Sequence, residues 1–382
     1  MVMLLIPLWV IQLHGSPFAL GVDVAAVSIA PMIFAIPIGA AADRLGSHTI
    51  VLIGAISAGI STLLSISIGN VWLFGFWQMI AGLGRSSAWI GAQTSVTRER
   101  SDTNRRAHRI GWLSVSAQVG NFGGPFLAGL LITRTSMRAT FVVAAVAIAA
   151  VAFSVSTRDV VGRPAKREAA QDAQVQGAAH SQNFGRAFRL LVLPSIRLML
   201  IGSIVRIALI AIRNSFYVVF LHHLGWNPLD IGIVLSLGSA ASAGSAALTG
   251  KLHSRFDTDG LLYASLFGMA LVFAVVPLSS SILVQAACMV VFGVGNGISQ
   301  TALISLLAKA TPVRDQGLAV GLRTTVNRAV QVAAPLLFGT LVTFVVLPTL
   351  ILGLGVASLA SVLGAAWFLK GTGQASSSDS LP

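Results

Sequence analysis

Long apolar stretches alternate with short polar connections along almost the whole chain. Most of these stretches hold about 20 residues, the length that an α-helix needs to cross the hydrocarbon core of a bilayer. The pattern predicts an all-α membrane protein with twelve spans, of which the first is too short to cross. The predicted spans are residues 1–13, 22–42, 48–69, 71–95, 109–132, 139–157, 196–221, 229–250, 259–279, 281–308, 316–346 and 347–369.

Composition supports this class and argues against others. Hydrophobic residues make up 55% of the chain and charged residues only 10%, whereas a soluble domain carries about a quarter charged residues. The net charge is +13, but the basic residues lie between apolar stretches, as membrane topology signals do, rather than in one nucleic-acid-binding patch. The single cysteine, Cys288, leaves no disulfide and no cysteine-based metal site. We expect a lipid bilayer around the protein, no nucleic-acid partner, no cofactor and no metal.

The basic residues also predict how the chain is oriented. Connections after even-numbered spans hold most of them, Arg44 included, whereas the opposite connections hold only Arg134 and Arg138. The positive-inside rule places the more basic side in the cytoplasm. We therefore predict a multi-pass protein of the bacterial inner membrane, with a cytoplasmic middle loop at 158–194 and a cytoplasmic tail at 371–382.

The chain contains an internal repeat. Proline and glycine positions of residues 1–157 recur in residues 195–370 at a nearly constant offset. The matched pairs are Pro17 with Pro228 and Gly21 with Gly232 at an offset of 211, then Pro125 with Pro335 and Gly129 with Gly339 at an offset of 210. Two parallel repeats of six helices place a transport site between them, near the middle of the membrane. The short first span has a longer counterpart in the second half, so we expect the natural first helix to begin upstream of Met1.

A polar motif follows the second predicted span. It reads Gly39-Ala-Ala-Ala-Asp43-Arg44-Leu-Gly46, and in this pattern and position the chain resembles the major facilitator superfamily. The resemblance implies a fold of two six-helix halves that rock about a central site. It also implies a gating role for these four residues: Gly39 permits close helix approach, and the Asp43 carboxylate accepts hydrogen bonds at the N-terminus of a facing helix.

A second motif lies in the fifth predicted span. Residues 120–129 read Gly120-Asn-Phe-Gly-Gly124-Pro125-Phe-Leu-Ala-Gly129, and they resemble the antiporter motif of the drug and metabolite:proton antiporter branch with 12 helices. Glycines four residues apart form a smooth face for another helix, and Pro125 removes a backbone donor and bends its own helix. The resemblance implies export and a gating role, and the alternative is a packing groove without a role in transport.

Polar residues deep in apolar spans are candidates for function, because they are costly to bury in a membrane. Those that we assign to substrate binding are Gln78, Arg85 and Trp89 in the fourth span, Arg206, Arg213, Asn214 and Tyr217 in the seventh, and Asn327, Arg328 and Gln331 in the eleventh. In one interpretation they line a cavity that attracts an anionic or polar substrate. In the other, the arginines pair with backbone carbonyls or carboxylates, or extend toward the membrane surface.

One acid lies at comparable depth. Asp23 follows Pro17 by six residues and is a candidate for proton coupling. The alternative is that its carboxylate is stabilised by the positive N-terminal end of its own helix.

Three functions remain open on this basis. The first is a monomeric secondary transporter that exports small amphipathic or organic molecules in exchange for protons. The second is an exchanger of organic anions, such as sugar phosphates, that uses the buried arginines. The third is a membrane sensor that transports nothing. A membrane enzyme is not expected, because the chain has no Ser-His-Asp set, phosphate loop or metal-ligand spacing.

Overall fold

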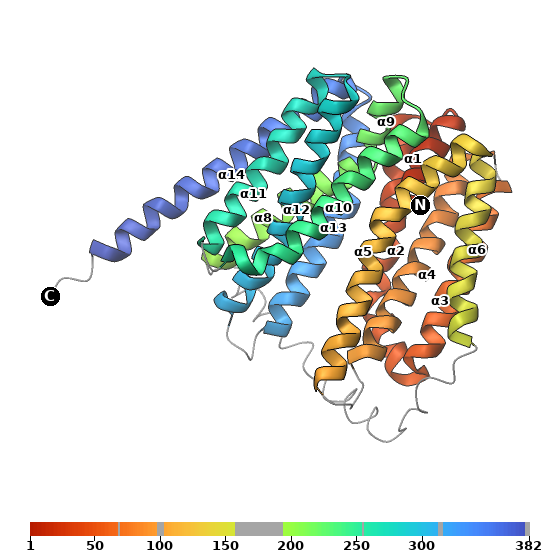
Figure 1. Ribbon diagram of the computed structural model, residues 1–382, viewed down its shortest axis with the longest axis horizontal. Coiled ribbons are helices and arrows are strands. Elements are labelled where there is room, and N and C mark those ends of the chain that lie inside the picture. The colour runs from red at the N-terminus through yellow and green to blue at the C-terminus, as the bar shows by residue number, and fades with distance from the viewer. Residues whose placement is uncertain (68, 98–102, 157–193, 254–255, 312–315, 379–382) are drawn as a thin grey trace.

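The computed structural model describes residues 1–67, 69–97, 103–156, 194–253, 256–311 and 316–378 (Figure 1). The predicted middle loop therefore lies almost entirely outside the described residues, as do the last four residues of the predicted tail. Within the described ranges every regular element is a helix, which confirms the predicted all-α class.

The helices follow the predicted spans closely. The first group along the chain comprises α1 (Val2–Gln12), α2 (Pro17–Leu45), α3 (Ser47–Leu64), η1 (Ser65–Ser67), α4 (Val71–Thr97), α5 (Thr103–Arg134) and α6 (Met137–Ser156). The second comprises α8 (Pro194–Arg213), α9 (Phe216–His223), α10 (Pro228–His253), α11 (Thr258–Val275), η2 (Val276–Leu278), α12 (Ile282–Ala310), α13 (Gln316–Leu341) and α14 (Leu347–Ser378).

Nine helical segments of the described chain are long and apolar enough to cross a membrane. Of the twelve predicted spans, the first forms α1, which has only 11 residues. The fourth and eleventh form α4 and α13, which are 27 and 26 residues long but too polar to be among the nine. These two helices carry six of the predicted substrate-binding residues, and that polarity is what separates them from the others.

Polar residues in the connections fix where several helices begin. Ser16 caps α2 by accepting a hydrogen bond from the amide of Ala19 at 3.2 Å, and Pro17 occupies the first turn, where its missing N–H costs nothing. Asn70 and Ser136 cap α4 and α6 in the same way, at 2.9 Å and 3.1 Å. The helices on this side of the molecule therefore begin at defined residues.

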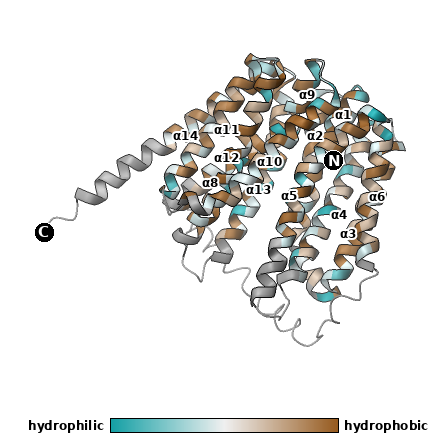
Figure 2. Cartoon of the chain, viewed as in Figure 1, coloured by the Kyte–Doolittle hydropathy of each residue, from teal (hydrophilic) through white to brown (hydrophobic). Residues whose placement is uncertain are grey.

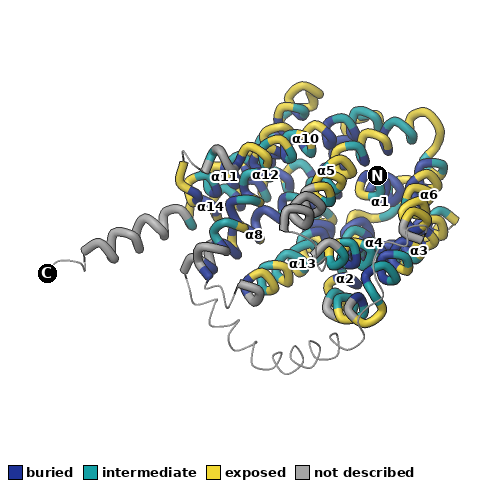
Figure 3. The backbone as a smooth tube through the Cα atoms, turned by 60° about the horizontal axis from the view of Figure 1, so that its bottom comes forward, coloured by how far each residue is buried: buried dark blue, intermediate teal, exposed yellow. Residues whose placement is uncertain are grey.

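The outward surface is apolar. Figure 2 shows hydrophobic residues along most of the length of the helices, and Figure 3 shows buried residues mainly on the sides that face other helices. Large side chains such as Phe153 and Leu283 are 71% and 78% exposed in the protein alone. Such a surface suits hydrocarbon, because the helices satisfy their own backbone hydrogen bonds.

The two groups of helices meet where α2 packs against α13. A Cβ atom added at Gly21 would lie 2.5 Å from the carbonyl oxygen of Pro335, and one added at Gly339 would lie 2.7 Å from the carbonyl oxygen of Pro17. Only glycine allows two backbones to approach this closely.

The same contact occurs a second time, between α5 and α10. A Cβ atom at Gly232 would lie 2.5 Å from the carbonyl oxygen of Pro125, and one at Gly129 would press on the carbonyl oxygen of Pro228. The hydroxyl of Ser236 also donates to the carbonyl of Phe122 at 2.7 Å, across this contact. The residues of both contacts are the proline and glycine pairs that the internal repeat matches. The repeat is therefore a repeat of one backbone contact, made at the end of the molecule where α2 and α10 begin.

Gly21→Ala should destabilise the protein, because its Cβ would overlap the Pro335 carbonyl. Overpacking of this kind costs about 1–3 kcal/mol, so we expect the melting temperature of the purified protein to fall by about 3–8 °C. Gly39→Ala is the matched control on the same helix, since nothing lies within 4 Å of a Cβ at that position. Equal melting temperatures for the two variants would contradict the contact.

Candidate functional site

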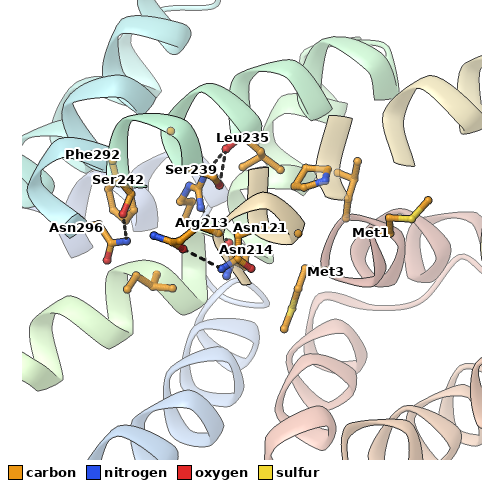
Figure 4. Close-up of a pocket in the computed structure, with 17 residues that line it drawn as sticks. Met1, Met3, Asn121, Arg213, Asn214, Leu235, Ser239, Ser242, Phe292 and Asn296 are labelled. Carbon is orange, nitrogen blue, oxygen red and sulfur yellow. Dashed lines mark hydrogen bonds between the residues drawn. The ribbon is translucent and has the colours of Figure 1, made fainter. Parts of the chain in front are cut away.

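A cavity of about 300 Å³ lies between the two groups of helices. The first group contributes residues at the start of α1 and in α5, and the second contributes residues of α8, α10 and α12 (Figure 4). Its polar lining residues are Gln118, Asn121, Arg213, Asn214, Ser239, Ser242 and Asn296. Among the lining residues there is no carboxylate, so Arg213 contributes the single charged side chain of the described wall.

Arg213 is held by uncharged partners. One guanidinium nitrogen (Nη2) donates to the carbonyl of Leu235 at 2.6 Å, and the other (Nη1) makes a long bond of 3.4 Å to Oδ1 of Asn214. The guanidinium carbon lies 5.5 Å from the ring centre of Phe292, within range of a cation–π interaction. In the described structure the positive charge is therefore oriented by neutral groups and not neutralised by an acid.

The helix that carries Arg213 is broken. Met199–His223 form one segment long and apolar enough to cross a membrane, in agreement with the predicted span 196–221, but α8 ends within it at Arg213 and α9 begins at Phe216. Ser215 leaves the helical region with φ −124° and ψ −84°, and its hydroxyl donates to the carbonyl of Ala211 at 2.7 Å, in competition with the backbone. A discontinuous helix is tolerated inside a membrane where it lines a cavity. Asn214 lies in the break and faces the cavity.

The break also separates Arg213 from Tyr217, the other seventh-span residue that we had assigned to substrate binding together with it. Tyr217 is fully buried, and its hydroxyl donates to Oε1 of Gln285 at 3.0 Å. Gln285 in turn donates to the carbonyls of Val276 and Ser279 at 2.8 and 2.6 Å. Tyr217 therefore ties α9 to α12 and η2 and does not line the cavity.

Arg206 lies two turns before Arg213 on α8 and is also away from the cavity lining. Its Nη2 donates to Oε1 of Gln300 on α12 at 2.9 Å, and the side chain is 7% exposed. Arg206 is thus bonded to a side-chain amide of a neighbouring helix, a partner that neither interpretation named.

A second polar cluster joins α13 to the first group of helices. Arg328 donates to Oε1 of Gln331 at 3.3 Å and to the hydroxyl of Ser86 at 3.5 Å, and the hydroxyl of Ser28 donates to Gln331 at 3.4 Å. The side-chain oxygen of Asn327 is buried without a hydrogen-bond partner. The bonds to Ser86 and from Ser28 cross between the two groups of helices and are long, so they are readily broken when the groups move apart.

The predicted residues of α4 do not line the cavity. Gln78 is fully buried and donates to the hydroxyl of Ser65 at 3.3 Å. Trp89 is 41% exposed and is not among the cavity-lining residues. Both terminal nitrogens of Arg85 are buried without a hydrogen-bond acceptor.

Asp23 is fully buried in the first group of helices. Neither carboxylate oxygen has a hydrogen-bond partner. The side chain lies against Gly75 of α4, where an added Cβ atom would overlap Oδ1. An ionised carboxylate in such surroundings is costly, whereas a protonated one is tolerated.

The predicted gating residues fall into three sets. Gly39 and Gly46 have nothing within 4 Å of an added Cβ, Arg44 is exposed, and the Asp43 side chain lies outside the described residues. Gly120 and Pro125 line the cavity, and Gly124 lies against the backbone of Met1. Gly129 makes the close contact with α10 described above. The helix approach that we expected at Gly39 is thus not made in this structure.

Sequence analysis missed most of the cavity wall. Gln118 and Asn121 flank the glycines of the α5 motif, Ser239 and Ser242 lie on one face of α10, and Asn296 follows the α12 glycines. A signal was available, because each is a polar residue inside an apolar span. We had selected polar residues in the fourth, seventh and eleventh spans, whereas these five residues lie in the fifth, eighth and tenth. In the part of the chain that the structure describes, no cluster of three or more His, Cys, Asp or Glu side chains could hold a metal ion.

Comparison with known proteins identifies relatives. A family model described as the Major Facilitator Superfamily matches residues 1–335. The chain is 23% identical over 326 residues to the class B tetracycline resistance protein of Escherichia coli, covering 84% of this chain and 78% of that protein. It is 23% identical over 323 residues to the class D tetracycline resistance protein of Salmonella ordonez, covering 83% and 78%.

Solved structures share the fold at low identity. The nucleoside transporter NupG matches with a TM-score of 0.78 and 15% identity, covering 96% of this chain and 97% of that one. The peptide transporter POT in complex with sulfate matches with a TM-score of 0.71 and 16% identity, covering 97% and 91%.

Tyr217→Phe should lower stability, since it leaves Oε1 of buried Gln285 without a donor. An unsatisfied buried group of this kind costs about 1–3 kcal/mol, so we expect a melting temperature lower by a few degrees and unchanged binding in the cavity. Differential scanning fluorimetry of the purified variant measures the first effect. A stable variant that loses ligand binding would return Tyr217 to the cavity wall.

Proposed function

The chain belongs to the Major Facilitator Superfamily, and we propose that this multi-pass membrane transporter exports a small organic molecule in exchange for protons. The observation that carries the proposal is the cavity, whose wall comes from both groups of helices. A site shared between two halves is exposed to opposite sides of the membrane in turn when the halves rock against each other. Secondary transporters work in this way.

The conformation of the protein in this structure fits one stage of such a cycle. The glycine contacts of α2 with α13 and of α5 with α10 hold the halves together at the end where α2 and α10 begin. At the other end Gly39 and Gly46 have no neighbour within 4 Å of an added Cβ. We assign the first end to the outside and the second to the cytoplasm, as the distribution of basic residues predicts, so this conformation receives substrate from the cytoplasm. In the opposite conformation, Gly39, Asp43, Arg44 and Gly46 would form the closed cytoplasmic gate.

Export is supported by two observations. The segment Gly120–Gly129 matches the antiporter motif and forms both cavity wall and outer contact. The two relatives named above are tetracycline resistance proteins. We further propose that the protein acts as a monomer in a bacterial inner membrane, with the middle loop and the C-terminus in the cytoplasm.

Proton coupling rests on Asp23. Its carboxyl group is buried without a hydrogen-bond partner, so its ionised form is stable only after α2 and α4 move or water enters. A group that binds a proton in one conformation and releases it in another couples the proton to the cycle. Arg206 and Gln78 are bonded to partners in the described structure and are left out of the proposed binding site, whereas Arg213 and Asn214 remain in it.

Exchange of organic anions is a second candidate, favoured by Arg213 in a cavity whose described lining residues include no carboxylate. The two functions separate in vesicles that contain the purified protein. We expect an imposed pH gradient to drive accumulation of labelled tetracycline or labelled gluconate above protein-free vesicles, and nigericin to abolish it. Counterflow that ignores the pH gradient would replace export by anion exchange. No movement of either probe, by gradient or counterflow, would refute both.

Asp23→Asn should uncouple transport from the proton. The amide cannot ionise but keeps the shape of the protonated acid, so we expect accumulation driven by the pH gradient to fall at least about tenfold, while counterflow stays within about twofold of wild type. Both are measured in the same vesicles. If the gradient still drives full accumulation, Asp23 is not the coupling group.

A further inference from the structure

The cavity wall combines one charged side chain with several carboxamides. Four of the residues that line it carry side-chain amides, and two more carry hydroxyls. The amides are Gln118, Asn121, Asn214 and Asn296, and the hydroxyls belong to Ser239 and Ser242. Each amide offers both a donor and an acceptor. Hydroxyl groups of a ligand match such a wall, because they also donate and accept.

The charge on Arg213 points toward an anionic ligand. Its partners in the described structure are a carbonyl, an amide and an aromatic ring, none of which neutralises the guanidinium. A charge in a site of low dielectric is costly without a counter-ion. The bond from Nη1 to Asn214 is 3.4 Å long, so an incoming carboxylate can replace it with a shorter, charge-assisted bond.

Glycine provides the space that the guanidinium occupies. A Cβ atom at Gly238 would lie 3.0 Å from Nη2 of Arg213 and 2.9 Å from the carbonyl oxygen of Met289. A Cβ atom at Gly293 would press on the carbonyl of Gly238. These two glycines bring α10 and α12 together, and the Arg213 side chain lies beside Gly238. Its Nη2 is directed at the Leu235 carbonyl (Figure 4). Gly238 and Phe292 are therefore positioning residues for the charge.

We infer that the transported molecule is a small hydroxylated monoanion, such as a sugar acid or another polyhydroxy carboxylate. Its carboxylate binds Arg213, and its hydroxyls bind the surrounding amides and serines. A lipophilic cation would face an unshielded positive charge, and an apolar anion would leave the buried Oδ1 of Asn296, which has no donor in the described structure, unsatisfied. The inference rests on the proposed transport function, because it identifies the substrate class of the same cavity.

Equilibrium binding to the full chain in lipid nanodiscs tests the inference. The probes are gluconate, sorbitol as its uncharged counterpart, hexanoate as an anion without hydroxyls, and tetraphenylphosphonium as a lipophilic cation. By isothermal titration calorimetry we expect gluconate to bind at least tenfold more tightly than each of the other three. Equal binding of sorbitol or hexanoate, tighter binding of the cation, or no binding of gluconate would overturn the substrate class.

Two glycine variants test whether Gly238 positions the Arg213 guanidinium. Gly238→Ala displaces the guanidinium, so the Kd for gluconate should rise about tenfold. Gly244→Ala is the matched control on the same helix, because nothing lies within 4 Å of a Cβ there, and its Kd should stay within twofold. Equal Kd values would refute the role of Gly238. Should Gly238→Ala fail to fold, Phe292→Leu removes the aromatic ring from Arg213 and is expected to raise the Kd for gluconate at least threefold. An unchanged Kd would show that the position of the Arg213 guanidinium does not determine binding.

The binding and transport experiments can refute the substrate class and the proposed export separately. Gluconate binding without any flux linked to protons would refute the proposed export and leave the substrate class intact. Proton-linked flux of tetraphenylphosphonium, with no gluconate binding, would refute the substrate class and leave the export intact.

Discussion

The close approach of two pairs of helices is the constraint on which the rest of the molecule depends. Proline carbonyls meet glycine backbones where α2 crosses α13 and where α5 crosses α10. Because neither glycine has a side chain, the halves touch backbone to backbone at that end and leave room for a cavity beside the contact. Pro125 contributes to both the contact and the cavity, since it lines the cavity and its carbonyl oxygen lies against Gly232.

This contact occurs twice in the molecule, and this explains which positions the sequence repeat matches. Gly21 and Pro335 come from opposite halves, and their repeat counterparts Gly232 and Pro125 form the equivalent contact. Substitution at any one of the four alters a contact between halves, whereas most other positions are free to differ between the copies. The two halves therefore match chiefly at prolines and glycines. Such a pairing can open and close as one unit, because it involves few side-chain hydrogen bonds.

The sequence predicts some features of the molecule and not others, because the features leave different kinds of signal in it. The all-α class, the limits of most spans and the repeat were predictable, because hydropathy and glycine spacing report on local burial and close packing. The break at Asn214 and Ser215 was not predictable, because no proline or glycine lies there. The competing hydrogen bond from Ser215 to Ala211 is seen only in the three-dimensional structure. The candidate site was predicted in part: Arg213 and Asn214 line the cavity, whereas Tyr217, Arg206 and Gln78 have partners in neighbouring elements. Depth in a span does not tell which way a side chain points.

The positions of the acid and the arginine constrain any coupling between them. Asp23 lies against Gly75 inside the first half, whereas Arg213 lies in the wall contributed by the second half. A proton and a substrate would then not compete for one site, and their coupling has to pass through helix movement. Helix α2 is suited to this, since Gly21 packs on α13 of the opposite half and Asp23, two residues later, packs on α4 of its own half. Deprotonation of Asp23 would disfavour its packing on α4, and any shift of α2 that relieves this also moves Gly21 against Pro335. The same helix therefore connects the acid to the backbone contact between the two groups of helices.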